Sequence, residues 1–262
     1  MAGRLTIIGG GVMGLMTAYQ AAPLAQTVTV LDRSQIGDPA TASFGLTRSI
    51  RNDYRDPDYA RLAFEARRLW HEFERDCGQR LLVDCGCLNL VKASVTPDVP
   101  ASYAVRSFAV LEELQLRRAA LPGPALAERF PQFAAGGGWL DADAGFADVA
   151  AVTALLRSVL PGRGVEVREE TQIRAITRSG GCWQVQTSDG LVESDVLVIT
   201  AGPGTNKLLE LMACAMSWTE AGSWNSLDDD EWGGWGSNPR PADYESAPLP
   251  SSPVQDRPEL GG

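Results

Sequence analysis

The sequence predicts an α/β fold with a parallel sheet at its centre, and three observations support this class. The apolar run Leu5–Ile8 is followed at once by a glycine-rich turn with G-x-G-x-x-G spacing and by a helical pattern. A second apolar run, Thr27–Leu31, ends at Asp32, so the segment has the order strand, turn, helix, strand, acid. The late apolar run Asp195–Thr200 leads into a second glycine turn, and such a strand would return to the first sheet. The predicted class is therefore a Rossmann-like dinucleotide-binding fold.

Each glycine of the first turn has its own role in this fold. Gly9 permits the tight turn, Gly11 lets a pyrophosphate approach the backbone, and Gly14 lets the helix pack closely on the strand. The helix expected from Val12 to about Ala22 directs its free N–H groups at that pyrophosphate. Asp32 can accept hydrogen bonds from a ribose diol and would repel a 2′-phosphate, which disfavours a phosphorylated nicotinamide cofactor. FAD and NAD both remain open on these residues, and a glycine turn in an unrelated α/β protein is the alternative.

The composition excludes several classes of function. The chain has 262 residues, 44% of them hydrophobic, which is enough for one large domain or two smaller ones. The net charge of −10 argues against a nucleic-acid partner, because a phosphate backbone needs a basic surface. The five cysteines form no C-x-x-C pair and there is one histidine, so no metal site is expected. Without a secretory signal or a membrane-spanning apolar stretch, a cytoplasmic protein with reduced thiols and no membrane partner is expected.

A long polar connection follows, from Arg33 to Tyr54, and connections of this length are usually functional or disordered. Its small residues would let backbone approach a flat ligand: Ser43, Gly45 and Thr47. Arg48 and Arg51 lie three residues apart, so in a helical turn they would project from one face. A solvated basic turn is the alternative.

The middle of the chain is mostly helical in pattern. Helices are expected at Asp58–Asp76, Ser102–Arg118, Pro124–Phe130 and Val149–Leu160, with strand character at Leu81–Val91 and after Gly136. His71 lies among charged residues and is expected to be a surface residue rather than a base. Cys85 and Cys87 are expected to be small hydrophobic fillers of a strand, with a redox-active pair as the alternative.

From Val165 onward the pattern changes to β structure. Short strands separated by turn residues are expected at Val165–Arg168, Gln172–Thr177, Trp183–Thr187 and Leu191–Ser194. The regular periods end past Leu211. Residues 213–262 hold nine acids, two bases, six prolines and four of the seven tryptophans. This segment is expected to be unstructured, or foreign to the fold that precedes it.

Four passages, in the same order along the chain, resemble the D-amino-acid oxidase superfamily of FAD-dependent oxidoreductases. They are IIGGGVMGLMTAY, SFGLTRSIR, AERFPQF with GGGWLDADAGFADVAAV, and DVLVITAGPGTNKLL, and they cover roughly residues 4–210. Within the superfamily, the chain is most similar to the sarcosine oxidase and N-methyl amino acid oxidase branch. The resemblance implies an FAD-binding domain made of residues 1–57 and 145–211. An incomplete α+β substrate domain, residues 58–144, would be interleaved with it, and residues 212–262 would form an unstructured or foreign tail.

The resemblance implies FAD rather than NAD as the cofactor. The cofactor-binding residues that it implies are Gly9, Gly11, Val12, Met13, Gly14, Asp32, Arg33, Ser43, Gly45, Thr47, Arg48, Ala201 and Gly202. The passage Val167–Ile173 would run past the adenine. Two arginines would act in catalysis. Arg51 would anchor a substrate carboxylate through its guanidinium, and Arg48 would supply positive charge beside the flavin.

The function implied by the resemblance is oxidation of the C–N bond of an amino acid or secondary amine, with oxygen as the acceptor. Phe44 departs from the pattern, because sarcosine oxidases carry a histidine there. Family members also continue well beyond the NKLL segment, and residues 212–262 match none of that continuation. The chain is therefore expected to be truncated at its C-terminal end, or to need a partner chain that supplies the missing half. A catalytically inactive flavin-binding fragment and an NAD-dependent dehydrogenase are the alternative functions.

Overall fold

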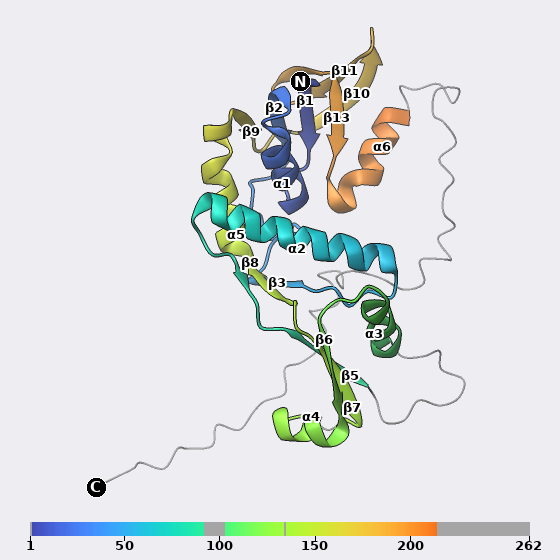
Figure 1. The fold of residues 1–262 in the computed structure, drawn as a ribbon. Coiled ribbons are helices and arrows are strands. Elements are labelled where there is room, and N and C mark those ends of the chain that lie inside the picture. The colour runs from blue at the N-terminus through green and yellow to red at the C-terminus, as the bar shows by residue number, and fades with distance from the viewer. Residues whose placement is uncertain (1, 92–102, 134, 214–262) are drawn as a thin grey trace, which may run out of the picture. The chain divides into compact units, whose positions relative to one another are not determined.

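The centre of the fold is a parallel sheet whose strands come from distant parts of the sequence. The computed structural model describes residues 2–91, 103–133 and 135–213. The four strands have the order β13 (Val196–Ile199), β1 (Ala2–Ile8), β2 (Ala25–Leu31) and β9 (Val165–Arg168), with parallel pairing throughout (Figure 1). Ile7 pairs with Val198 on one side and with Val30 on the other. The predicted α/β class is confirmed, and so is the return of the late strand to the first sheet.

Helices cover one face of this sheet. Ile7 and Val30 are fully buried, and Leu15 of α1 (Val12–Ala21) packs in the same apolar cluster. Leu156 of α5 (Val149–Val159) also belongs to this cluster. A short 3-10 helix, Pro161–Arg163, joins α5 to β9. Continuous apolar runs are needed in such strands because a parallel sheet is buried on both faces.

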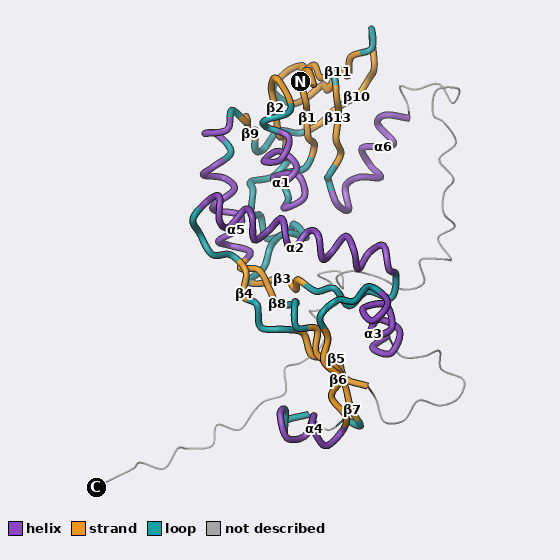
Figure 2. Tube along the Cα trace, in the orientation of Figure 1, coloured by secondary structure: helices purple, strands orange, loops and turns teal. Residues whose placement is uncertain are grey.

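The other face carries an antiparallel meander. Its strands are β10 (Ile173–Ser179), β11 (Cys182–Thr187) and β12 (Gly190–Ser194). Ile176 and Val185 pair across β10 and β11, are fully buried, and cluster with Leu31 of β2. The chain then passes through β13 and a 3-10 turn, Gly202–Gly204, into α6 (Thr205–Ala213) (Figure 2). The sequence pattern did not predict α6, which packs Leu208 and Met212 onto the same cluster.

Two further three-stranded sheets account for the middle of the chain. One has the order β3 (Thr47–Ile50), β8 (Gly145–Asp148), β4 (Leu82–Val83), and the other β5 (Cys87–Val91), β7 (Gly137–Asp141), β6 (Arg118–Pro122). The single strand expected at Leu81–Val91 is therefore two strands. They are separated at Gly86, whose φ of +78° suits glycine and breaks the extended run.

The remaining helices are α2 (Pro57–Cys77), α3 (Tyr103–Glu113) and α4 (Gly123–Arg129). The α2 helix begins where Asp56 accepts the Asp58 N–H at 2.8 Å, and it ends at Gly78 in a left-handed conformation. The helix expected at Ser102–Arg118 ends earlier than predicted, because Gln115 has φ of +56° and Arg118 begins β6. No helix of the described residues is both long and apolar enough to cross a bilayer. The predictions for residues 214–262 lie outside the described part of the chain.

Candidate functional site

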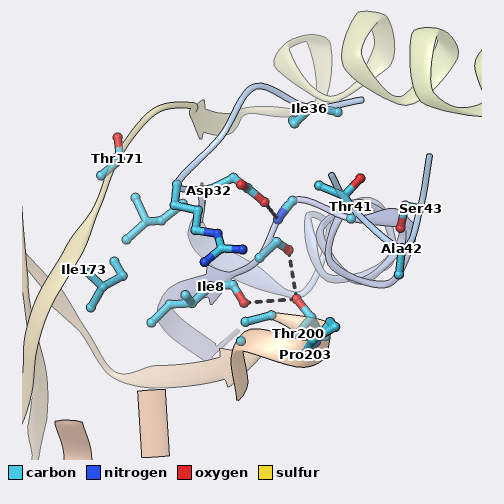
Figure 3. A pocket seen from close by; sticks show the side chains of 18 of the residues that line it. Ile8, Asp32, Ile36, Thr41, Ala42, Ser43, Thr171, Ile173, Thr200 and Pro203 are labelled. Carbon is cyan, nitrogen blue, oxygen red and sulfur yellow. Dashed lines mark hydrogen bonds between the residues drawn. The ribbon is translucent and has the colours of Figure 1, made fainter. Parts of the chain in front are cut away.

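A cavity of about 270 Å³ opens at the carboxyl ends of β1, β2 and β13 (Figure 3). Its floor includes both glycine turns, Gly9–Gly11 and Ala201–Gly204, and its sides include Asp32 and Ser43. In open α/β sheets, ligands bind in the crevice outside the carboxyl ends of the strands. The position of the cavity is therefore the one that this fold uses for a ligand.

The two glycine turns pack against each other without room for side chains. A Cβ on Gly9, whose φ is +113°, would lie 2.5 Å from the Thr200 carbonyl oxygen. A Cβ on Gly14 would lie 1.8 Å from the Gly9 carbonyl oxygen. The Thr200 hydroxyl donates to that oxygen at 2.9 Å and links the turns (Figure 3). Because Gly9 and Gly14 have no side chains, the first glycine turn, the start of α1 and the second glycine turn can pack in direct contact.

The N-terminus of α1 faces the cavity. Gly11 is its N-cap residue and provides no side-chain cap. The Val12 N–H donates instead to the Ser43 hydroxyl at 3.0 Å, a contact across the polar connection that the sequence did not predict. Helix N-termini attract anions because their N–H groups and dipole carry partial positive charge.

Asp32 is held at the end of β2 by two backbone groups. Its Oδ2 accepts the Gly10 N–H at 2.6 Å (Figure 3), and its Oδ1 accepts the Ser34 N–H at 2.8 Å. A carboxylate has about four lone-pair sites, so acceptor capacity remains for a ribose diol. The two bonds orient the carboxylate toward the glycine turn.

Loops from three parts of the chain complete the walls. Arg33 and Lys207 line the cavity, and neither side chain has a hydrogen-bond or ion-pair partner within the part of the chain that the structure describes. Thr171, Gln172 and Ile173, from the passage predicted to run past the adenine, also line the cavity. Other lining residues were not singled out by the sequence: Ile36, Thr41, Thr153, Lys207 and Leu211. Two unpaired cations that line the same cavity as a helix N-terminus favour an anionic ligand.

The structure brings together one part of the predicted cofactor set and leaves the other part outside this cavity. The cavity is lined by Gly9, Gly11, Val12, Asp32, Arg33, Ser43, Ala201 and Gly202. The predicted residues that do not line it are Met13, Gly14, Gly45, Thr47, Arg48 and Arg51. Met13 is 69% exposed, and Gly14 lies beneath the turn where it meets α1.

Arg48 and Arg51 do not lie on one face of a helical turn, because Arg48 is in the strand β3 and Arg51 directly follows the end of that strand. Residues three apart in an extended chain point to opposite faces. Arg48 donates to the carbonyl oxygens of Thr47 and Ala42, at 2.9 and 2.6 Å, and also to that of Phe44. Its guanidinium therefore holds the loop that carries Ser43 and Gly45.

Arg51 belongs to a separate polar cluster. It donates to Asp53 at 2.7 Å, and its guanidinium lies 5.3 Å from the Tyr54 ring centre and 5.7 Å from that of Tyr103. Asp53 is 1% exposed, and burial raises its pKa although Arg51 opposes the shift. Burial likewise raises the pKa of the Cys87 thiol, with a further contribution from the charge of Asp53. Cys87 is therefore a poor nucleophile, and Cys85 and Cys87 are both free thiols.

His71 of α2 lies between two acidic side chains, those of Glu74 and Asp84. Its Nδ1 lies 2.7 Å from Glu74 Oε2, and its Nε2 lies 3.5 Å from Asp84. Glu74 also accepts the N–H groups of Leu81 and Leu82. No group of three metal-ligating side chains occurs among the residues that the structure describes.

The residues of the cavity fit FAD. The glycine turn carries no side chains that would block a diphosphate, the α1 N-terminus and two cations match its charge, and Asp32 matches a ribose diol. Pockets that enclose a whole drug-sized ligand measure about 300–1,000 Å³. A cavity of about 270 Å³ therefore suits one part of an extended dinucleotide. Fold and site together define a dinucleotide-binding protein of the Rossmann type.

The comparisons with known proteins define the class further. The family model of FAD dependent oxidoreductases, DAO, matches residues 4–217, so the chain belongs to this family and FAD is the family's cofactor. The peroxisomal sarcosine oxidase of Homo sapiens is 26% identical over 214 residues, which are 80% of this chain and 53% of that protein. The N-methyl-L-tryptophan oxidase of Yersinia pestis (strain Pestoides F) is 24% identical, over 78% of this chain and 55% of that protein.

Solved structures agree with the family. NikD, an unusual amino acid oxidase essential for nikkomycin biosynthesis, aligns with a TM-score of 0.67 and 27% identity, covering 80% of this chain and 54% of NikD. The resemblance to the sarcosine oxidase branch that the sequence predicted is thereby confirmed. The chain spans about half the length of the curated relatives that it matches.

Proposed function

We propose that this chain binds FAD in the cavity and provides the cofactor-holding part of an oxidase for amino acids or secondary amines. Bound FAD would supply the acceptor for a hydride from the carbon beside the substrate nitrogen, with oxygen as the final acceptor. The observation that carries the proposal is the cradle at the α1 N-terminus. There the Gly9–Gly11 turn, Asp32 and the Ala201–Gly202 turn converge on one cavity.

Each part of the chain has a proposed task in this function. The glycine turn and the start of α1, from Gly9 to Gly14 with Val12 and Met13 included, and the Ala201–Gly202 turn would border the diphosphate, and those of their N–H groups that are not bonded within the chain would donate to it. Asp32 would bind the ribose, with Arg33 beside it. Ser43, Gly45, Thr47 and Arg48 would border the ring system, in keeping with the bonds by which Arg48 holds the loop of Ser43 and Gly45.

Arg51 is proposed to bind a substrate carboxylate. The support is its geometry: one guanidinium nitrogen is fixed by Asp53, two tyrosine rings lie against the group, and the side chain is still 27% exposed. A guanidinium presents five donors, so one bond to Asp53 leaves others for a ligand.

The proposed reaction belongs to a complete site. Because the chain spans about half the length of its relatives, the remaining half of such a site would come from equivalent residues on a partner chain or on a longer polypeptide. We place this assembly in the cytoplasm, a proposal supported by four free thiols among the described residues.

The test is a visible absorption spectrum of the purified chain, recorded before and after addition of FAD and desalting. A retained flavin spectrum supports the proposal, and a colourless protein contradicts it. Binding of NADH in place of FAD would favour the dehydrogenase. Turnover of N-methyl amino acids is then compared with that of free FAD. Flavin retention without turnover would assign cofactor binding to this chain and catalysis to the complete assembly.

A further inference from the structure

The cavity wall that follows Asp32, residues 33–37, is held by a distant part of the chain. The Asp32 N–H donates to the Arg168 carbonyl oxygen at 2.9 Å, and the Thr171 N–H donates to the Asp32 carbonyl oxygen at 2.8 Å. The Glu170 N–H donates to the Ser34 carbonyl oxygen at 3.4 Å. These backbone bonds fix the first half of the wall against the residues that follow β9.

Side chains hold the second half of the wall. Glu169 Oε1 accepts the Ile36 N–H at 3.0 Å. Arg157 of α5 forms an ion pair with Glu169 at 3.1 Å, and its Nη1 lies 3.5 Å from the Ile36 carbonyl oxygen. One ion pair thus engages both backbone polar groups of Ile36. The Ile36 side chain is 7% exposed and lines the cavity (Figure 3).

The backbone adopts an unfavourable conformation where the two segments meet. Glu170 has φ of +56°, a region that residues other than glycine rarely occupy. Such conformations persist where the surroundings over-determine them, and they cluster at ligand sites. With this conformation, the consecutive residues Glu169 and Glu170 both bond to the wall.

We propose that the Arg157–Glu169 ion pair is a positioning device that presets residues 33–37 for the ADP half of FAD and thereby sets the affinity. This inference rests on the proposed function, because it takes FAD as the ligand of the cavity. The wall directly follows the acid that accepts ribose hydroxyls in this fold, so it borders the ADP half. Without the ion pair, Ile36 would be ordered only on binding, and that ordering lowers affinity.

The experiment compares dissociation constants of the purified chain for FAD and for ADP, with and without Glu169→Ala. Both constants are expected to rise about tenfold, which corresponds to about 1.4 kcal/mol. The matched control is Glu166→Ala, which removes the Glu166–Arg168 pair on β9, a pair that does not touch the wall. The control is expected to leave both constants unchanged while lowering the thermal midpoint of the ligand-free chain as much as Glu169→Ala does.

Two further variants separate positioning from general stability. Glu169→Gln keeps an acceptor for the Ile36 N–H but loses the ion pair with Arg157, so it is expected to recover only part of the FAD affinity, with a constant about threefold above that of the unmodified chain. Arg157→Lys keeps the charge but loses the planar fork, and a smaller rise of about threefold is expected. Faster hydrogen exchange of the Ile36 amide in ligand-free Glu169→Ala would support the inference directly.

Unchanged constants in Glu169→Ala, with FAD still bound by the unmodified chain, would overturn the inference and leave the proposed function standing. An equal rise in Glu166→Ala would also overturn it. A chain that binds neither FAD nor ADP before any substitution would overturn both statements.

Discussion

Gly11 and Gly14 are expected to matter for different reasons, Gly11 for FAD binding and Gly14 for the packing of α1 on the glycine turn. Alanine substitution at each position tests the two roles separately. A Cβ on Gly11 would meet the Ser43 hydroxyl at 2.9 Å, the end of a side chain that can rotate. Gly11 has φ of −70° and ψ of 179°, which alanine adopts without strain. Gly11→Ala therefore is expected to change the stability of the ligand-free chain by only about 0.5 kcal/mol, the cost of a weaker N-cap.

Gly14→Ala meets backbone instead of a mobile side chain. Its Cβ would lie 1.8 Å from the Gly9 carbonyl oxygen and 2.8 Å from the Thr200 hydroxyl, so α1 has to move away from the turn. Overpacking costs about 1–3 kcal/mol, and because the clash here is with backbone the cost falls in the upper part of that range, about 2–3 kcal/mol, against a gain in helix propensity of about 1 kcal/mol. A net loss of about 1–2 kcal/mol lowers the thermal midpoint by about 2–8 °C for a domain of this size.

The assay measures both properties for both variants. Thermal unfolding of the ligand-free chain is expected to separate them, with Gly14→Ala the less stable. FAD titration is expected to show a loss of at least about tenfold for Gly11→Ala, because the new methyl group occupies the approach of the diphosphate. FAD affinity unchanged in Gly11→Ala, or a larger stability loss in Gly11→Ala than in Gly14→Ala, would refute this reasoning.

Three further predictions concern the core, a partly buried acid and the ribose site. Phe73→Ala, which removes a 1% exposed ring packed 4.7 Å from Tyr19, is expected to lower the free energy of unfolding by about 3–5 kcal/mol in urea titration. Burial alone would raise the pKa of Glu74, but the N–H groups of Leu81 and Leu82 and the side chain of His71 outweigh it and lower that pKa below its ordinary 4.5. The resulting stabilisation is complete above about pH 4.5 and is lost as the pH falls through the folded-state pKa. Glu74→Gln is therefore expected to flatten the acid limb of stability against pH, and an unchanged limb would contradict the assignment. Asp32→Asn is expected to weaken FAD binding about tenfold in calorimetry, and an unchanged constant would exclude Asp32 from the ribose site.

Much of the central fold was predictable because its signals are local. The apolar runs of β1 and β2, the glycine spacing and the acid at the end of β2 all lie within residues 5–32. The meander was equally readable, since Gly180 and Gly190 mark its turns. α6 was missed because its apolar residues acquire a partner only when β10 and β13 come together.

For the site, the sequence determined which residues form the glycine cradle, because a tight turn, a helix start and a strand end are local events with local residue requirements. It did not determine which loops close the cavity. The Ser43–Val12 bond, the Glu169–Ile36 bond and the Arg51–Asp53 cluster with Tyr103 depend on side chains meeting across long sequence separations or on a strand replacing a helical turn. Only tertiary packing decides such contacts, because hydrophobic periodicity records which face of an element is buried and not which polar group it will meet.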